Sequence, residues 1–243
     1  LTGLNFSIRV WWYPVSYQAK SVKAVIINTR NNMTYSVKAL LGLDPEEPLN
    51  FKDTLIAGRW LQRYDEAVCI VPDTIAKVLN ISLGDKLHIV GHSMDLIVIG
   101  IIDTNKANSL LDLDKYPITP YNPDILSSIL RGFIQQEDYI PLSFREVMIV
   151  PSTFLLKQGG YISSIATRFN DFTSLKNKAT YVAKALDLLN IYICDGKSVL
   201  MVSPYVLFSF YGWSTLMAPL VMGMFIIANT MVGAVQERRR EKN

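Results

Sequence analysis

The sequence has 243 residues, of which 50% are hydrophobic and 19% are charged. Its net charge is only +3, and much of it gathers in the last seven residues, which excludes the broad basic surface of a nucleic-acid-binding protein. The length suffices for one or two pieces with a hydrophobic core. Because the chain begins with Leu1 and shows no signal peptide, we expect a piece of a longer protein.

The first half alternates predicted strands with turns. Runs of apolar, β-branched residues predict strands at 6–12, 21–29, 34–42 and 66–72. A loop with two prolines covers 43–53, and its acids Glu46 and Glu47 are expected to be solvated. A short helix is expected at 73–80, with Asp73 as its N-cap.

The stretch HIVGHSMDLIVIG, starting at His88, resembles the nucleophile elbow G-x-S-x-G of an α/β-hydrolase. The elbow requires a small residue where Asp95 stands, and a helix after the serine, whereas DLIVIGII favours a strand. The two histidines of the chain, His88 and His92, both precede Ser93, so the hydrolase order Ser, Asp, His cannot be completed. The stretch therefore predicts a β-hairpin whose turn is GHSM.

Metal and redox sites are not indicated. His88 and His92 flank a strand end and a turn, without an acid in motif spacing, and are interpreted as facing solvent. Cys69 and Cys194 lie far apart in two apolar strands, which does not fit a metal or redox pair. We expect two buried free thiols, with a single disulfide as the alternative.

The second half returns to order after a polar stretch. Residues 104–143 contain four prolines and predict a long surface excursion with one helix near 124–135; Asp112 and Asp114 are interpreted as solvated acids. A good apolar stripe of period 3.6 predicts an amphipathic helix over 171–190. Further elements are expected as strands at 146–151, 163–170, 191–195 and 198–202, and as a short helix at 153–157.

Three Asn-x-Ser/Thr sequons begin at Asn5, Asn32 and Asn80. They are glycosylation acceptors outside the cell, although chance gives a similar number in a chain of this length. No nucleotide-binding loop of the form G-x-x-x-x-G-K-[ST] occurs, and no group of residues predicts catalysis, so we expect a protein that is not an enzyme.

The end of the chain predicts a transmembrane helix. No charged residue occurs from Ser198 through Gln236, and the run 206–235 is apolar on all sides, unlike a soluble helix. Aromatic residues gather upstream, and four bases follow downstream, a flank that stays in the cytoplasm. The tail is therefore expected inside and the residues before about 205 outside.

This helix is expected to run from Pro204 to Arg240. At about 1.5 Å per residue it measures roughly 55 Å, against a hydrocarbon core of roughly 30 Å, so its first turns are expected to form a stalk. Pro219 is expected to bend it. Gly212, Gly223 and Ala234 recur on one face, which favours close packing with another helix, although small residues are common in membrane helices.

Several segments, in their order along the chain, resemble the MacB/FtsX-type ABC permeases. LGLDPEE, AGRWLQRYDEAVCIVPDTIAKVLNISLGDKLHIVG and LIVIGIID are similar to the family's extracytoplasmic core domain. EVMIVPSTFLL and ISSIATRFND resemble the strand, helix and strand that follow it. IIANTMVGAVQERRRE is similar to the second transmembrane helix and its cytoplasmic motif, although the family continues Glu-Ile-Gly where this sequence ends Glu-Lys-Asn.

The resemblance implies a permease subunit without an ATPase of its own and without a cofactor. ATP is expected to bind a separate cytoplasmic ABC ATPase subunit, whose cycle reaches the outside domain through the stalked helix. The resemblance also implies pairing as a homodimer or with a second permease, contact with lipid, an extracytoplasmic partner, and efflux, lipoprotein release or partner activation as the outcome. The residues expected at the cytoplasmic anchor and coupling point are Glu237, Arg238, Arg239, Arg240 and Glu241.

The expected fold is α+β, with a mixed-sheet extracytoplasmic domain over 1–203 that is similar to the MacB periplasmic core. The stalk and transmembrane helix follow over 204–240, and a short cytoplasmic tail over 241–243. The alternative function is a membrane-anchored binding or sensor ectodomain with a single span. Further hydrophobic spans beyond Asn243, beside an ATPase gene, separate the two.

Overall fold

The computed structural model describes residues 6–14, 23–124, 140–169, 172–185, 191–202 and 213–240. The chain divides into two compact units, Leu1–Lys178 with Tyr192–Leu200 and Ala179–Ile191 with Met201–Asn243. The boundary expected at residue 203 lies outside the described residues.

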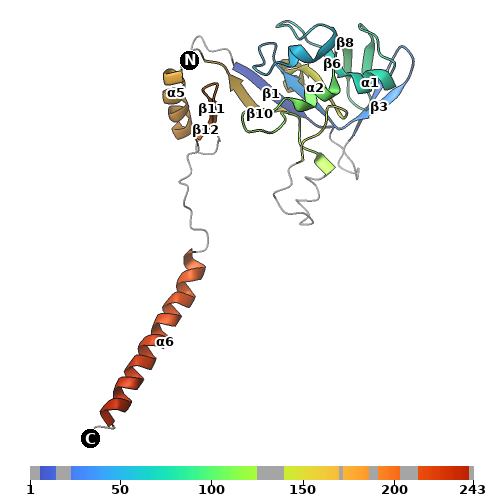
Figure 1. Cartoon of the computed structure of the whole chain (residues 1–243). Helices are drawn as coiled ribbons and strands as arrows, with labels where there is room; N and C mark the ends of the chain where they lie inside the picture. Colours follow the sequence, from blue (N-terminus) through green and yellow to red (C-terminus); the bar gives the residue numbers. More distant parts are fainter. Residues whose placement is uncertain are drawn as a thin grey trace. The chain divides into compact units, whose positions relative to one another are not determined.

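A large mixed sheet forms the first unit (Figure 1). Its strand order is β10-β1-β4-β9-β6-β8-β7-β2-β3, and β5 pairs with β8. The pairs β4–β9 and β6–β8 are parallel, and the other pairs are antiparallel. The α+β prediction with a mixed sheet is confirmed. The strands are β1 (Phe6–Trp12), β2 (Ala24–Asn28), β3 (Thr34–Val37), β4 (Ala39–Leu43), β5 (Leu55–Gly58), β6 (Val68–Pro72), β7 (Lys86–Ile89), β8 (Met94–Ile102), β9 (Val147–Pro151) and β10 (Tyr161–Thr167).

Two similar segments, each a strand followed directly by a short helix, pair at the centre of this sheet. Strands β6 and β9 each end in Ile-Val-Pro, and helices α1 (Asp73–Val78) and α4 (Ser152–Lys157) begin at the next residue. The prolines hold extended backbone and act as N-caps, because a proline ring fixes φ and cannot continue a strand ladder. The two strands cross in antiparallel pairing at Ile70 and Ile149, and each has a parallel partner on its other side.

The central strands are buried on both faces. Along β9, Met148 and Val150 belong to one core cluster, and Val147 and Ile149 to the other. Since successive strand residues point to opposite faces, the clusters lie on the two sides of the sheet. One cluster includes residues of α1 and α4; the other includes Phe51 of the short helix η1 (Phe51–Thr54) and residues from 107 to 144.

The prediction of a surface excursion over 104–143 is wrong for much of its described part. Helix α2 (Thr104–Ser109) starts this segment, with the Asp103 carboxylate accepting the N–H groups of residues 105 and 106. Ile118 and Leu142 are nearly fully buried in the core. Prolines break helices but fit extended chain, so a proline-rich segment can still cover a sheet. The helix expected at 124–135 falls almost wholly outside the described residues.

Two local predictions for the first half also need correction. The run 34–42 is not one strand: it divides at Lys38, and β3 pairs with β2 while β4 pairs with β1 and β9. Lys38 forms ion pairs with Asp124 and Glu146 at 3.2 and 2.9 Å, which tie this crossing point to the sheet. Asp73 is the first residue of α1 instead of its N-cap, which is Pro72.

The elements expected after residue 160 are present, with bounds that differ by a few residues where the structure describes them, whereas β5 was not predicted. Helix α5 (Phe172–Ala185) follows β10, and strands β11 (Ile191–Cys194) and β12 (Val199–Val202) form a two-stranded sheet. Helix α6 (Trp213–Arg240) is a 28-residue helix with Pro219 inside it. The expected start at Pro204 lies outside the described residues.

The transmembrane span expected over 206–235 is not shown. Among the helices of the described residues, none combines the length and the apolar character required to cross a membrane.

Candidate functional site

The hairpin around Ser93 is confirmed. Strands β7 and β8 pair antiparallel, with His88 opposite Asp95 and Ile89 opposite Met94. Ser93 is exposed in the turn, and none of its hydrogen bonds within the described residues involves a histidine. An exposed serine in a hairpin turn, with no histidine bonded to it in the part of the chain that the structure describes, agrees with the predicted turn residue.

The polar residues of this hairpin pair with one another on its surface. Asp95 accepts from Lys86 Nζ at 2.7 Å and contacts His88 Nδ1 at 2.8 Å. The hydrogen bond from Lys86, and to a smaller extent the contact with His88, hold the pKa of Asp95 below its ordinary value. His88 therefore has an acidic neighbour, Asp95, which lies opposite it on the paired strand and not one helical turn away. It makes a surface ion pair of small energetic weight.

His92 has a structural role that the sequence did not indicate. Its ring lies edge-on to Trp12, with 4.8 Å between the ring centroids, and it is half-buried instead of solvent-facing. It packs the hairpin turn against the end of β1. Within the described residues, no group of three or more His, Cys, Asp or Glu side chains is arranged to hold a metal ion.

A buried ion cluster is the most unusual feature of the domain. Arg9 of β1 is only 2% exposed. Its guanidinium donates to Glu47 through Nη2 at 2.8 Å and Nε at 3.2 Å, and Nη1 pairs with Asp112. The cluster joins β1, the loop after β4 and the segment after α2.

Glu47 is satisfied on all sides. Its side chain is fully buried, and it accepts from the Ser7 hydroxyl at 2.8 Å and the Leu49 N–H at 3.3 Å as well as from Arg9. Burial disfavours the charged guanidinium, but Glu47 and Asp112 outweigh that effect and raise the pKa of Arg9 above its ordinary value. Arg9 therefore stays charged, and its contacts with Glu47 and Asp112 act as a fixed clamp.

The prediction that the loop acids are solvated is wrong for two of them. Glu47 and Asp112 belong to the clamp. Glu46 forms an exposed pair with Arg63, and Asp114 accepts the N–H of Tyr116 at the surface. The available signal lay in FSIRVWW, where Ser7 and Arg9 share the strand face opposite Ile8 and Val10.

A second carboxylate in the same loop ties β1 to α4. Asp44 accepts the Ile8 N–H at 2.6 Å and also the Ser152 hydroxyl. The Trp11 indole donates to Ile118 O at 3.1 Å, which attaches β1 to the segment after α2. Strand β1 is thus held along its length. Because the acids of this cluster already accept charged or strong donors, the arrangement favours rigidity over proton transfer.

The two cysteines are both free. Cys69 is buried, and burial raises the pKa of its thiol, so its reactivity is low. Cys194 is exposed, which corrects the expectation that both thiols are buried. The free state itself agrees with the preferred prediction.

Helix α6 carries most of the residues predicted for anchoring and packing. Pro219, Gly223, Ala234 and residues 237–240 belong to it, whereas Gly212 and Glu241 lie outside the described residues. The bend, the packing face and the coupling role stay predictions. Apolar side chains project from it exposed, including Leu220, Val221, Met222, Met224, Phe225, Ile226, Ile227, Met231 and Val232.

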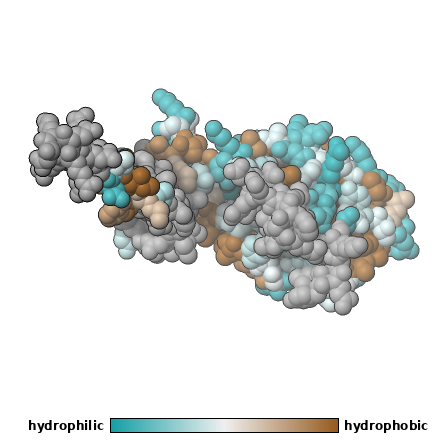
Figure 2. Space-filling model, turned by 90° about the horizontal axis from the view of Figure 1, so that it is seen from below, coloured by the Kyte–Doolittle hydropathy of each residue, from teal (hydrophilic) through white to brown (hydrophobic). Residues whose placement is uncertain are grey.

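The sheet domain presents a different surface. The face seen in Figure 2 mixes hydrophilic and hydrophobic side chains. Exposed apolar residues are dispersed there among charged ones, as is normal for a globular surface.

No family model matches this sequence, and no curated protein matches it. Among solved structures, the fold is similar to the periplasmic region of MacB from Actinobacillus actinomycetemcomitans, at 12% sequence identity and a TM-score of 0.45. The match covers 84% of this chain and 74% of that chain. Activity and partners are therefore inferred from the residues of this chain itself.

Proposed function

We propose that this chain is the extracytoplasmic domain and adjoining helix of a permease subunit of a MacB/FtsX-type ABC transporter. The domain moves as a body when a separate cytoplasmic ATPase subunit completes its cycle. It performs no covalent chemistry, and its movement drives efflux, lipoprotein release or activation of a partner outside the membrane.

The observation that carries this proposal is the sequence of helix α6. Twenty-four uncharged positions, Trp213 to Gln236, precede Glu-Arg-Arg-Arg in one helix of 28 residues. Leu220, Phe225 and Ile227 are 61, 73 and 65% exposed, and Phe225 lies on a different side of the helix from the other two. Exposing apolar area to water costs roughly 25 cal/mol for each Å². We therefore expect lipid or neighbouring helices to cover this surface.

The charged end sets the orientation. Arginines next to an apolar span remain on the cytoplasmic side, and moving one to the bilayer centre costs several kcal/mol. Arg238, Arg239 and Arg240 therefore fix the depth of the helix, and the sheet domain is expected on the opposite side. A cytoplasmic ATPase then has its docking point near this end of α6.

The clamp at Arg9 suits such a body. A domain transmits movement efficiently only if its own deformation is small compared with the distance that it moves. The clamp joins three segments distant in sequence, and the central strands are buried on both faces. We therefore assign the clamp a mechanical role within the permease.

Orientation is tested first, with the chain's own cysteines. In intact cells, a membrane-impermeant maleimide should label Cys194, which is exposed, but not Cys69, which is buried. In a Cys194→Ser background, Asn243→Cys should react only after the cells are permeabilised. Labelling of both sites from the same side overturns the orientation.

Coupling is tested with the complete transporter. Reversal of Arg238, Arg239 and Arg240 to Glu should impair ATP-coupled activity, while Cys194 accessibility shows whether the outside domain still folds and reaches its side. Lys242→Glu, the reversal of a single neighbouring base outside the run of three arginines, should have a smaller effect. If no ATPase co-purifies and the triple variant is indistinguishable from wild type, the single-span sensor ectodomain becomes the better reading.

A further inference from the structure

The structure distinguishes the three sequons by what their hydroxyl residues do. In the first, Ser7 is 1% exposed and its hydroxyl donates to the buried Glu47 at 2.8 Å. A sugar-transferring enzyme needs access to the asparagine and to the hydroxyl two residues later. The hydroxyl of the Asn5 sequon is therefore unavailable in the folded domain.

The other two sequons are fully accessible. Asn32 lies in the turn between β2 and β3 with φ of 56°, and Asn80 follows α1 with φ of 48°. Both asparagines and their hydroxyl residues, Thr34 and Ser82, are exposed. The left-handed backbone, which asparagine adopts more readily than most residues, turns the chain sharply and leaves each side chain directed away from regular pairing.

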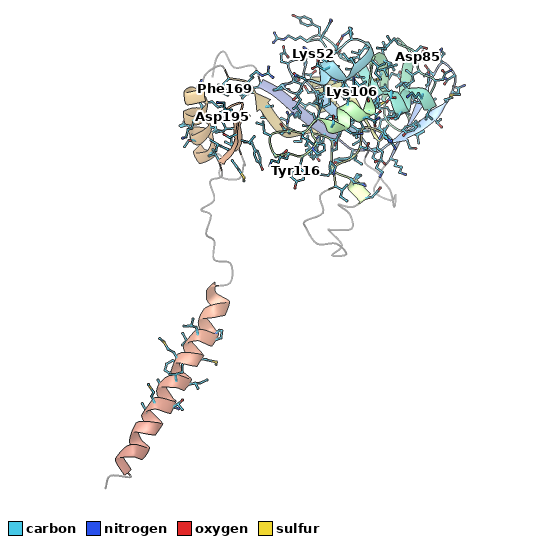
Figure 3. All side chains as sticks on the ribbon, in the orientation of Figure 1. Lys52, Asp85, Lys106, Tyr116, Phe169 and Asp195 are labelled. Atoms are coloured by element: carbon cyan, nitrogen blue, oxygen red, sulfur yellow. The ribbon has the colours of Figure 1, made fainter. Side chains whose placement is uncertain are left out.

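These two turns are locked together. Arg30 Nη2 donates to Asn80 O at 2.5 Å, and Asn31 Nδ2 donates to Leu79 O at 2.9 Å. Asn28 Nδ2 donates to both Leu79 O and Asp85, at 3.2 and 3.1 Å. Asp85, labelled in Figure 3, marks this end of the domain, where Figure 1 shows α1 beside β3. The sequons therefore converge on one rigid rim.

We propose that Asn32 and Asn80 carry N-linked oligosaccharides and that Asn5 does not. The donor is a polyprenyl-phosphate- or pyrophosphate-linked oligosaccharide, and a membrane-bound transferase acts on the chain. The amide Nδ2 forms a bond to the anomeric carbon as the bond from that carbon to the phosphate oxygen breaks. The lipid phosphate leaves, and the amide loses one proton to a base of the transferase; no oxidation or reduction occurs. This site deepens the proposed function, because it requires an extracytoplasmic domain.

Glycans at these two positions would cover a sheet edge and exposed apolar side chains. Strand β3 is one edge of the sheet, and an uncovered edge can pair with another chain. Asn32 stands two residues before that strand. Exposed apolar side chains flank both acceptors: Met33 is 45% exposed, and Val78 and Leu83 near Asn80 are 54% and 47% exposed. A bulky hydrophilic glycan shields both features from solvent and from neighbouring molecules.

The full chain, recovered from membranes of its source cells, provides the test. Protease digestion and intact-glycopeptide mass spectrometry should find a sugar mass on the Asn32 and Asn80 peptides, and an unmodified Asn5 peptide. Thr34→Ala should remove the mass from Asn32 alone, and Ser82→Ala from Asn80 alone. Thr34→Ser and Ser82→Thr, which keep the sequon, should retain it.

Bare peptides at Asn32 and Asn80 overturn the proposal, as does modification that favours Asn5. Labelling of Cys194 with the impermeant maleimide in the same cells separates this failure from that of the proposed function. Bare sequons with Cys194 labelled from outside refute the glycans and leave the permease standing. Bare sequons with Cys194 protected refute both.

Discussion

At the scale of single residues, Arg9 organises the domain. A charge buried in a strand of the sheet is stable only if its partners replace the water that burial removes. Glu47 and Asp112 do so from two loops distant in sequence, and the Ser7 hydroxyl and the Leu49 N–H donate further hydrogen bonds to the two Glu47 oxygens. One strand residue therefore fixes the positions of two loops.

Arg9→Met should lower the free energy of unfolding by about 3–5 kcal/mol, because it leaves Glu47 buried without a counter-charge. Denaturant unfolding of the full chain in detergent measures this. The matched control is Arg63→Met, which breaks an exposed pair with Glu46 and should cost no more than about 1 kcal/mol. The double variant Arg9→Met with Glu47→Leu should recover part of the loss. Equal effects of the two single variants would contradict the clamp.

Asp73 should make stability depend on pH. Burial opposes its charge, but Lys77 and the Thr104 N–H and hydroxyl outweigh that effect and lower the pKa of Asp73 to about 2. A depressed pKa stabilises the fold above the ordinary value of 3.8, and the contribution is lost as pH falls from about 4 to about 2. Lys77 is exposed, so the contribution is on the order of 1 kcal/mol. The stability difference between wild type and Asp73→Asn should shrink over this interval; a difference independent of pH refutes the assignment.

The acids show what residue patterns could and could not predict. Glu46 and Glu47 are adjacent and chemically alike, yet one is exposed and paired with Arg63 while the other is buried against Arg9. Their difference arises from which of the two side chains faces β1 when the loop after β4 packs against it, and this depends on tertiary structure. The strand pattern places Ser7 and Arg9 on one face of the strand but cannot identify the partners of either side chain.

At the scale of elements, the prediction succeeded where local chemistry dominates. Runs such as AVCIVP and EVMIVP are strongly β-branched and end in proline, so strand and boundary were both predictable. Two short elements were missed: η1 and α2 have four and six residues and depend on packing for stability. The break at Lys38 was missed because both halves have strand propensity, and only the pairing partners differ.

The β7–β8 hairpin yields a prediction of no effect. Ser93 is exposed in the turn, so Ser93→Ala should change the free energy of unfolding by less than about 0.5 kcal/mol and leave transport-coupled activity unchanged. A serine-directed fluorophosphonate probe should not label the wild-type chain. Labelling that disappears in Ser93→Ala would show that this serine is a nucleophile after all.

At the scale of the whole molecule, the proposed mechanism requires a rigid sheet domain and a helix whose apolar surface is covered by lipid or by another helix. The domain's stiffness follows from its two core layers and its clamp. The behaviour of α6 depends on surroundings that its own sequence specifies only in part. Apolarity predicts burial, but whether lipid or another helix covers each face depends on where small residues lie.

Gly223 identifies the face expected to pack against a second helix. A Cβ at Gly223 meets no described atom within 4 Å outside its own stretch of helix, so the glycine is not required by packing against other described parts of this chain. We therefore expect any loss of assembly or coupling in Gly223→Leu to come from contact with a neighbouring subunit. Leu220→Ala, three residues earlier, removes apolar volume without filling that face and should have the smaller effect. Co-purification of differently tagged copies and ATP-coupled activity measure both.

Cysteine cross-linking decides between a defined packing face and general exposure to lipid. Single cysteines placed at successive positions from 219 to 232, in a chain lacking Cys69 and Cys194, should cross-link with a period near 3.6 residues that peaks with Gly223. A helix that transmits movement must keep one register with its neighbour, so the periodicity should persist through the ATPase cycle even if its amplitude changes. Equally efficient cross-links at all positions refute the packing face and favour a helix that turns freely in lipid.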